Sequence, residues 1–133
     1  MFRQVDYLMV NVSDMRRSVA FYRDALGLPL KFESPGWSEF QTGATTLALH
    51  AVPSGAHSPA AVEGGPRAGT CSLGFSVEDL DATWETLKGR GVRFVMPPTD
   101  RTEEGILLAV GVDPDGLEIS FAQSKPRGNA PGA

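Results

Sequence analysis

The sequence predicts an α+β fold made of two copies of one strand–helix–strands unit. The segment Val12–Met15 opens one helical pattern, and Val77–Leu80 opens a second one 65 positions later. The apolar positions of both patterns recur at i, i+4, i+7 and i+11, the spacing of one helix face. Strand-like alternation precedes and follows each helix. Two such copies imply a pseudo-symmetric fold with a groove where the copies meet.

The first copy opens with an alternating strand over residues 5–12. One face of this strand carries Leu8, Val10 and Val12, and the other carries Tyr7, Met9 and Asn11. A helix with apolar positions from Met15 to Leu26 follows, capped by Ser13 or Asp14 and ended by Gly27. Short strands over 28–33, 37–42 and 45–51, separated by turn residues, complete the copy.

The second copy begins with a strand over 70–77, which has only small residues on one face: Ser72, Gly74 and Ser76. A helix over about 80–89 follows, with Trp84 expected in the core. Strands are predicted over 92–96, 106–112 and 117–122, with a polar turn or an irregular edge strand at 101–105. The turn Asp113–Gly116 precedes the last strand.

Residues 52–69 are rich in Pro, Gly, Ala and Ser, so they are expected to form a mobile linker or a lid. Residues 124–133 have nothing to bury and are expected to be disordered. The organisation is therefore a single domain over 1–123, with module one at 4–51 and module two at 70–123.

Bulk properties exclude several classes of function. A chain of 133 residues buries enough surface for one core. Its net charge is −4 and its basic residues form no stripe, which argues against nucleic acid. The longest apolar run, 106–110, is too short to cross a bilayer, and no signal peptide is read. A cytoplasmic location follows as the default. The single Cys71 is expected to be a small buried residue.

Two motifs accompany the repeated βαβββ order: the stretch from Val12 to Leu28 around the first helix, and the turn Asp113–Gly116. Together they resemble the vicinal oxygen chelate superfamily, which includes glyoxalase I, extradiol dioxygenases, fosfomycin-resistance enzymes and bleomycin-resistance proteins. The resemblance covers about residues 4–123. It implies two βαβββ modules forming an incomplete barrel around a cavity, and a homodimer.

The family's metal positions, carried over one at a time, fall on four residues without imidazole or carboxylate. These residues are Tyr7, Ala48, Ser72 and Ser120. Divalent zinc, iron and manganese prefer imidazole and carboxylate ligands, so the expectation is no metal and no other cofactor. The alternative is a shifted metal site using His50 and Glu118, although two ligands are too few alone.

Several side chains remain as candidates for a site. His50 lies on the same face of its strand as Ala48. The alternatives for it are a displaced metal ligand, a general base, a hydrogen-bond partner of a bound molecule and a plain rim residue. Glu118 shares parity with Ser120, and it either faces the cavity mouth, pairs with His50 or is merely solvated. Trp37 shares a face with Glu39 and Gln41. That face is either a stacking platform in the cavity or a solvent-facing partner surface, and the sequence leaves the choice open.

The preferred function is a metal-independent small-molecule-binding protein of the bleomycin-resistance or ligand-sequestering kind. Its partners would be a small organic ligand and a second copy, with neither nucleic acid nor membrane. The expected ligand-binding residues are Tyr7, Met9, Asn11, Trp37, His50, Ser72 and Ser120. One alternative is a lyase, isomerase or dioxygenase with a degenerate or shifted metal site, in which His50, Glu118 or Tyr7 acts as acid or base. Another is an interaction module with a collapsed cavity.

Overall fold

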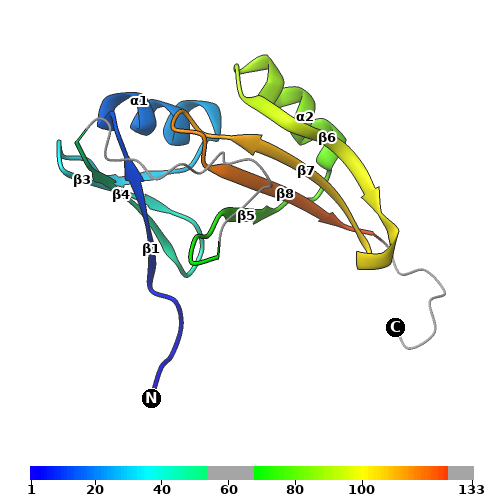
Figure 1. Cartoon of the computed structure of the whole chain (residues 1–133), viewed down its shortest axis with the longest axis horizontal. Coiled ribbons are helices and arrows are strands. Elements are labelled where there is room, and N and C mark those ends of the chain that lie inside the picture. Colours follow the sequence, from blue (N-terminus) through cyan, green and yellow to red (C-terminus); the bar gives the residue numbers. More distant parts are fainter. Residues whose placement is uncertain (54–67, 126–133) are drawn as a thin grey trace. The chain divides into compact units, whose positions relative to one another are not determined.

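The computed structural model describes residues 1–53 and 68–125 and divides the chain into two units, 1–67 and 68–133 (Figure 1). The boundary falls inside the predicted linker. Most of that linker and the last eight positions of the predicted tail lie outside the described residues, so the expectations for them stay predictions. Residues 1–67 form unit one and residues 68–133 form unit two.

Unit one contains one helical segment and one four-stranded sheet. Its elements are β1 (Tyr7–Val12), α1 (Met15–Ala20), a π-helix (Phe21–Ala25), β2 (Leu30–Phe32), β3 (Trp37–Gln41) and β4 (Thr46–Ala51). The strand order is β1-β4-β3-β2. β1 runs parallel to β4, and the other neighbours are antiparallel.

Unit two repeats this plan. Its elements are β5 (Leu73–Ser76), α2 (Leu80–Gly89), β6 (Arg93–Arg101), a 3₁₀-helix (Thr102–Glu104), β7 (Ile106–Val112) and β8 (Glu118–Ser124). The order β5-β8-β7-β6 again pairs the first and last strands in parallel. The α+β class and the predicted βαβββ repeat are therefore confirmed within each unit.

The two helix starts show how the repeat is encoded. Asp14 caps α1 by accepting a hydrogen bond from the Arg17 backbone N–H at 3.1 Å, and Asp79 caps α2 from the Ala82 N–H at 3.1 Å. Both caps have extended backbone angles, as an N-cap requires. Of the two candidate caps in the first copy, Asp14 is the one used.

The first helix departs from the regular helix that its period predicts. After Ala20 the chain widens into a π-helix, and the Leu26 N–H bonds to the Phe21 carbonyl five residues back at 3.0 Å. Tyr22 stays fully buried there, with its ring 5.0 Å from that of Phe21 and 6.0 Å from that of Phe40. Gly27 then ends the segment at φ +79°, as predicted.

The core of unit one lies between its helix and one face of its sheet. Fully buried side chains come from both layers: Val12, Val19, Tyr22, Phe40 and Leu49. On β1, Val10 and Val12 are buried whereas Tyr7, Met9 and Asn11 are exposed, so the predicted alternation is confirmed. On β3, Phe40 and Ser38 face the helix. The opposite face of the sheet therefore carries Trp37 and Glu39, which settles the parity.

Three predictions for unit two are wrong: the extent of its first strand, the burial of Cys71 and the core position of Trp84. β5 covers only Leu73–Ser76, so Cys71 and Ser72 precede the strand and both are exposed. Cys71 lacks the sheet neighbours that would bury it. Trp84 is half-buried rather than a core residue. Its ring meets Phe94 edge-on at 6.4 Å, and the Lys88 ammonium lies 3.7 Å over the ring.

Strands β6 and β8 are longer than predicted. β6 runs through Pro97 and Pro98 to Arg101, with register shifts on the way. It is an edge strand, where the missing proline N–H removes no required ladder bond. β8 includes Ser124, the first residue of the predicted tail. Within the described part of the chain, no helix has the length and apolar character needed to cross a membrane.

Candidate functional site

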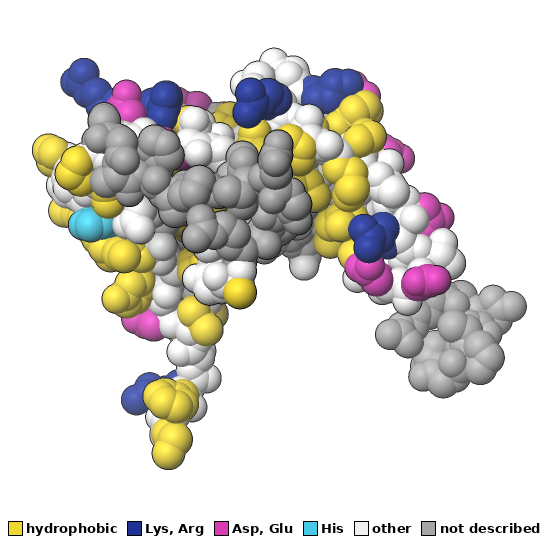
Figure 2. Space-filling view, viewed as in Figure 1, with side chains coloured by type: hydrophobic (Ala, Val, Ile, Leu, Met, Phe, Trp, Pro, Cys, Tyr) yellow, Lys and Arg dark blue, Asp and Glu magenta, His cyan; other side chains and the backbone are white. Residues whose placement is uncertain are grey.

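The face of the unit-one sheet opposite α1 carries most of the predicted ligand-binding residues. Strand register places on this face Tyr7, Met9 and Asn11 from β1, Thr46, Ala48 and His50 from β4, and Trp37, Glu39 and Gln41 from β3. Directly opposed residues of neighbouring strands share a face of the sheet. We call this surface the open face. In Figure 2, a histidine and hydrophobic side chains lie together at the surface of this unit.

An aromatic pair crosses the middle of the open face. Tyr7 lies beside Thr46 and Trp37 lies beside His50, yet their ring centroids are 6.0 Å apart at an interplanar angle of 73°. This edge-to-face contact crosses β4 at Ala48, whose side chain is fully buried. Tyr7 remains 55% exposed, so the pair covers the sheet and still presents ring surface.

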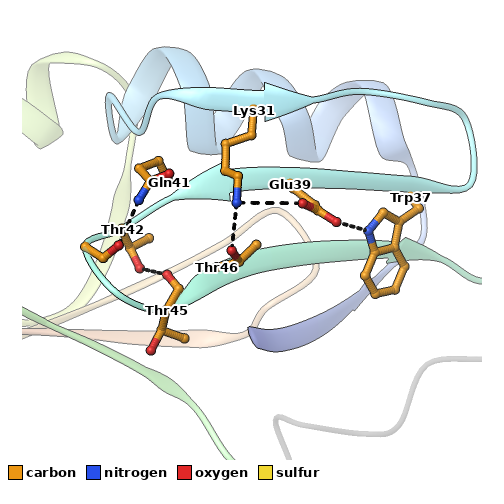
Figure 3. A network of polar contacts seen from close by, with 8 residues as sticks. Lys31, Trp37, Glu39, Gln41, Thr42, Thr45 and Thr46 are labelled. Atoms are coloured by element: carbon orange, nitrogen blue, oxygen red, sulfur yellow. Dashed lines mark hydrogen bonds and ion pairs between the residues drawn. The ribbon is translucent and has the colours of Figure 1, made fainter. Parts of the chain in front are cut away.

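A chain of polar contacts holds the indole through Glu39 and links that carboxylate to a cation (Figure 3). The Trp37 Nε1–H donates to Glu39 Oε2 at 2.8 Å. The Lys31 Nζ lies 3.9 Å from the other carboxylate oxygen of Glu39 and donates to Thr46 Oγ1 at 2.9 Å. The ammonium therefore stands at the Thr46 end of the open face, the end where Tyr7 lies.

The opposite end of the open face holds His50. Its Nδ1 lies 3.1 Å from the side-chain oxygen of Asn11, its register neighbour on β1. Its ring centroid is 6.2 Å from that of Trp37, its register neighbour on β3. His50 is thus a half-buried, oriented side chain of the site rather than an isolated rim residue.

The donor set does not fit the metal that the family resemblance implies. In unit one the corresponding positions are Tyr7 and Ala48, and Ala48 is buried without any ligand atom. In unit two they are Ser72, exposed ahead of β5, and Ser120, half-buried on β8. Over residues 1–53 and 68–125, no group of three or more His, Cys, Asp or Glu side chains is placed to hold a metal.

Unit two carries the remaining candidates. Ser120 lies opposite Gly74 on β5 and Val110 on β7, and a Cβ atom added to Gly74 would meet nothing within 4 Å. Glu118 lies opposite Val112 and is exposed. His50 and Glu118 belong to different units, each described by itself, so their pairing stays a prediction.

Carboxyl groups with shifted pKa values belong to surface ion pairs elsewhere in the molecule. The Arg23 guanidinium bonds both oxygens of Asp24 and lowers the pKa of that carboxyl. The Lys125 ammonium, with help from Thr102, lowers the pKa of Asp100. Both carboxylates are exposed, so these shifts indicate solvated pairs and not a catalytic carboxyl.

Sequence reasoning missed Lys31 and Thr46 as members of the site. Lys31 lies between Leu30 and Phe32 in a three-residue strand. A lysine in such a short strand is typical of a solvent-facing residue on an edge strand. The position of Lys31 follows only from strand register: Leu30 lies opposite buried Phe40, so Lys31 must face the other way.

Comparisons with known proteins agree with this fold. The model of the Glyoxalase/Bleomycin resistance protein/Dioxygenase superfamily matches residues 4–121. The uncharacterized protein YraH of Bacillus subtilis (strain 168) is 33% identical over 110 residues, covering 78% of this chain and 85% of that protein.

Solved structures extend the comparison. A glyoxalase/dioxygenase from Nostoc punctiforme has a TM-score of 0.78 at 23% identity, covering 93% of this chain and 92% of that one. TnmS3, an antibiotic binding protein from Streptomyces sp. CB03234, has a TM-score of 0.71 at 25% identity, covering 93% and 98%. With a family match over most of its length, the chain belongs to the Glyoxalase/Bleomycin resistance protein/Dioxygenase superfamily.

Proposed function

We propose that the open face of unit one binds a planar organic molecule without the help of a metal. The observation that carries the proposal is the edge-to-face pair of Tyr7 and Trp37 over buried Ala48. Tyr7 and Ala48 are two of the four positions where the family resemblance would place metal ligands, and the Tyr7–Trp37 pair offers ring surface there instead. A homodimer, implied by the resemblance, and a cytoplasmic location, expected by default, belong to the same proposal.

The physical support comes from how the face is built. Trp37 is held by its hydrogen bond to Glu39, so little side-chain entropy is lost when a ligand stacks on it. Polar groups at both ends, Lys31 and His50, orient a ligand whose middle is apolar. The relative TnmS3, which binds an antibiotic, supports a binding role for this chain as well.

One observation favours a second candidate, metal-free acid–base catalysis. His50 is oriented by Asn11 at the edge of the aromatic pair, the arrangement that a general base requires. Turnover decides between the two candidates: a binding protein returns its ligand unchanged after prolonged incubation, whereas an enzyme yields a product.

The binding role predicts that loss of either aromatic ring, Tyr7 or Trp37, weakens ligand binding. Hits from a thermal-shift screen of planar aromatic compounds should bind Tyr7→Ala and Trp37→Ala about threefold to tenfold more weakly, because ring stacking contributes roughly 0.5–1.5 kcal/mol beyond area burial. Phe2→Ala is the matched control, since Phe2 is 93% exposed and precedes the sheet. Isothermal titration measures the affinities. Equal binding by the parent and both ring variants would show that these residues are not the anchors.

The donor set predicts a protein without stoichiometric transition metal. Elemental analysis after purification without chelators should find no zinc, iron or manganese at one atom per chain, because Ala48 offers no ligand atom and hydroxyls bind these ions poorly. Added zinc should also leave the melting temperature unchanged. One tightly held metal ion per chain would refute the metal-independent role.

A further inference from the structure

The hydrogen bond of His50 determines what its ring can offer to a ligand. The Asn11 side-chain oxygen is an acceptor, so at 3.1 Å the His50 Nδ1 must carry the proton. In the neutral imidazole, Nε2 is then left as an acceptor. Across residues 1–53 and 68–125, this is the sole hydrogen bond that the structure gives to the ring.

The fold fixes this arrangement from both sides. Asn11 is the register partner of His50 in the parallel β1–β4 pair, so the two side chains emerge side by side. On the other side of His50 lies Trp37, whose only side-chain donor already bonds to Glu39. The tautomer of His50 is therefore set by Asn11.

The Lys31 end of the open face has the opposite hydrogen-bonding character. The Lys31 ammonium is a donor only, and it lies beside Thr46. Thr46 and His50 are four residues apart on β4, which at about 3.3 Å per residue separates them by roughly 13 Å. The open face thus has the Lys31 ammonium, paired with Glu39, at one end, and the His50 Nε2, an acceptor in the neutral imidazole, at the other. The rings of Tyr7 and Trp37 lie between them.

We propose that Asn11 is a positioning residue that holds His50 as a hydrogen-bond acceptor. The open face then selects planar aromatic ligands with an O–H or N–H donor at one end and an anionic group at the other. This inference rests on the proposed function and names the ligand class of the same site. His50 is half-buried in the free protein, and a bound ligand that covers its acceptor nitrogen without donating to it leaves that acceptor unpaired.

The tautomer can be measured without any ligand. The chain has two histidines, so ¹⁵N-labelled His57→Gln protein reports His50 alone. At alkaline pH, where imidazole is neutral, long-range ¹H–¹⁵N spectra should show the proton on Nδ1. Asn11→Leu should move the proton toward Nε2, and Asn11→Asp, which keeps an acceptor oxygen, should leave it on Nδ1. A proton on Nε2 in the parent protein would overturn the proposal.

Ligand selection is tested with three matched probes: 6-hydroxy-2-naphthoic acid, its methyl ether and unsubstituted 2-naphthoic acid. The hydroxyl probe should bind about tenfold more tightly than either control. The unsubstituted acid lacks the donor without carrying the bulk of the methyl group, so it shows the effect of losing the donor alone. In Asn11→Leu the preference should fall to about twofold or less. Asn11→Asp serves for the alkaline spectra alone, because at lower pH a carboxylate beside the ring favours the imidazolium, whose Nε2 donates. Lys31→Met should weaken binding of all three acids.

The outcomes separate the two proposals. Equal binding of the three acids to the parent would overturn the acceptor role of His50 and leave the binding function standing. Failure of all three to bind would overturn both. A preference that persists in Asn11→Leu, with its tautomer shifted in the spectra, would show that the donor is recognised elsewhere. Thermal melts of each variant confirm that the fold is kept.

Discussion

Phe40→Ala is expected to lower the free energy of unfolding of unit one by about 3–5 kcal/mol, the usual cost of removing a buried aromatic ring. The Phe40 side chain is fully buried, lies between its register neighbours Leu30 and Leu47, and contacts the Tyr22 ring. Domains of about 60–70 residues have small stability reserves, so this loss would leave the open face without a stable sheet beneath it.

Each unit contains one tryptophan, and this allows the test to be read unit by unit. In a Trp84→Phe background, fluorescence during urea unfolding reports Trp37 and hence unit one. The matched control is Phe32→Ala on the neighbouring strand β2, where the side chain is 53% exposed and the cost should stay below about 1 kcal/mol. Similar losses in the two variants would mean that Phe40 is not a core residue of unit one.

The fold was predictable because local signals in the sequence agree with one another. Asp14 and Asp79 each stand immediately before an apolar helical period, and both are caps in the structure. The alternation in β1 was readable because Val10 and Val12 differ so clearly from Met9 and Asn11. These features depend on neighbours in sequence, and sequence periodicity reports such neighbours directly.

The predictions that failed depend on contacts made across the fold. The π-helix keeps Tyr22 against Phe40, a residue on β3 that helix periodicity cannot detect. Cys71 lies in a strand-like stretch but ahead of the point where β5 joins β8, so it stays exposed. β6 passes through two prolines because it is an edge strand, which only the strand order reveals.

The sequence predicts several members of the open face but not their arrangement. Strand parity together with the family resemblance placed Tyr7, Met9, Asn11 and His50 on the cavity side of their strands, and the register of β1 against β4 puts them on one face. Placing Trp37 on the same face requires the register of β3 against β4, which brings Trp37 beside His50. Lys31 joins through β2, whose irregular pairing with β3 has no clear sequence signal. Strand register, rather than composition, therefore brings these residues onto one face of the sheet.

The Asp113–Gly116 turn also depends on a buried polar contact, and Asp113→Ala should cost about 2–3 kcal/mol of the stability of unit two. Asp113 is only 3% exposed, and its Oδ1 accepts the backbone N–H groups of Asp115 and Leu117, each at 2.9 Å. Alanine would leave both donors without this partner, and hydrogen bonds to a charged group typically contribute about 1.5–3 kcal/mol. The same turn sets the register of β7 against β8, which places Ser120 beside Val110.

The test uses Trp84 as the reporter of unit two in a Trp37→Phe background, with urea unfolding followed by fluorescence. Asp113→Asn is the matched control, because it keeps an acceptor oxygen of the same reach and removes only the charge; its cost should stay below about 1 kcal/mol. If asparagine were as damaging as alanine, the charge of Asp113 would be the stabilising feature rather than the two hydrogen bonds. If neither substitution mattered, the turn would be held by its backbone hydrogen bonds, Gly116 N–H to the Asp113 carbonyl and Asp113 N–H to the Leu117 carbonyl, each at 2.9 Å, with φ of +88° favouring glycine at position 116.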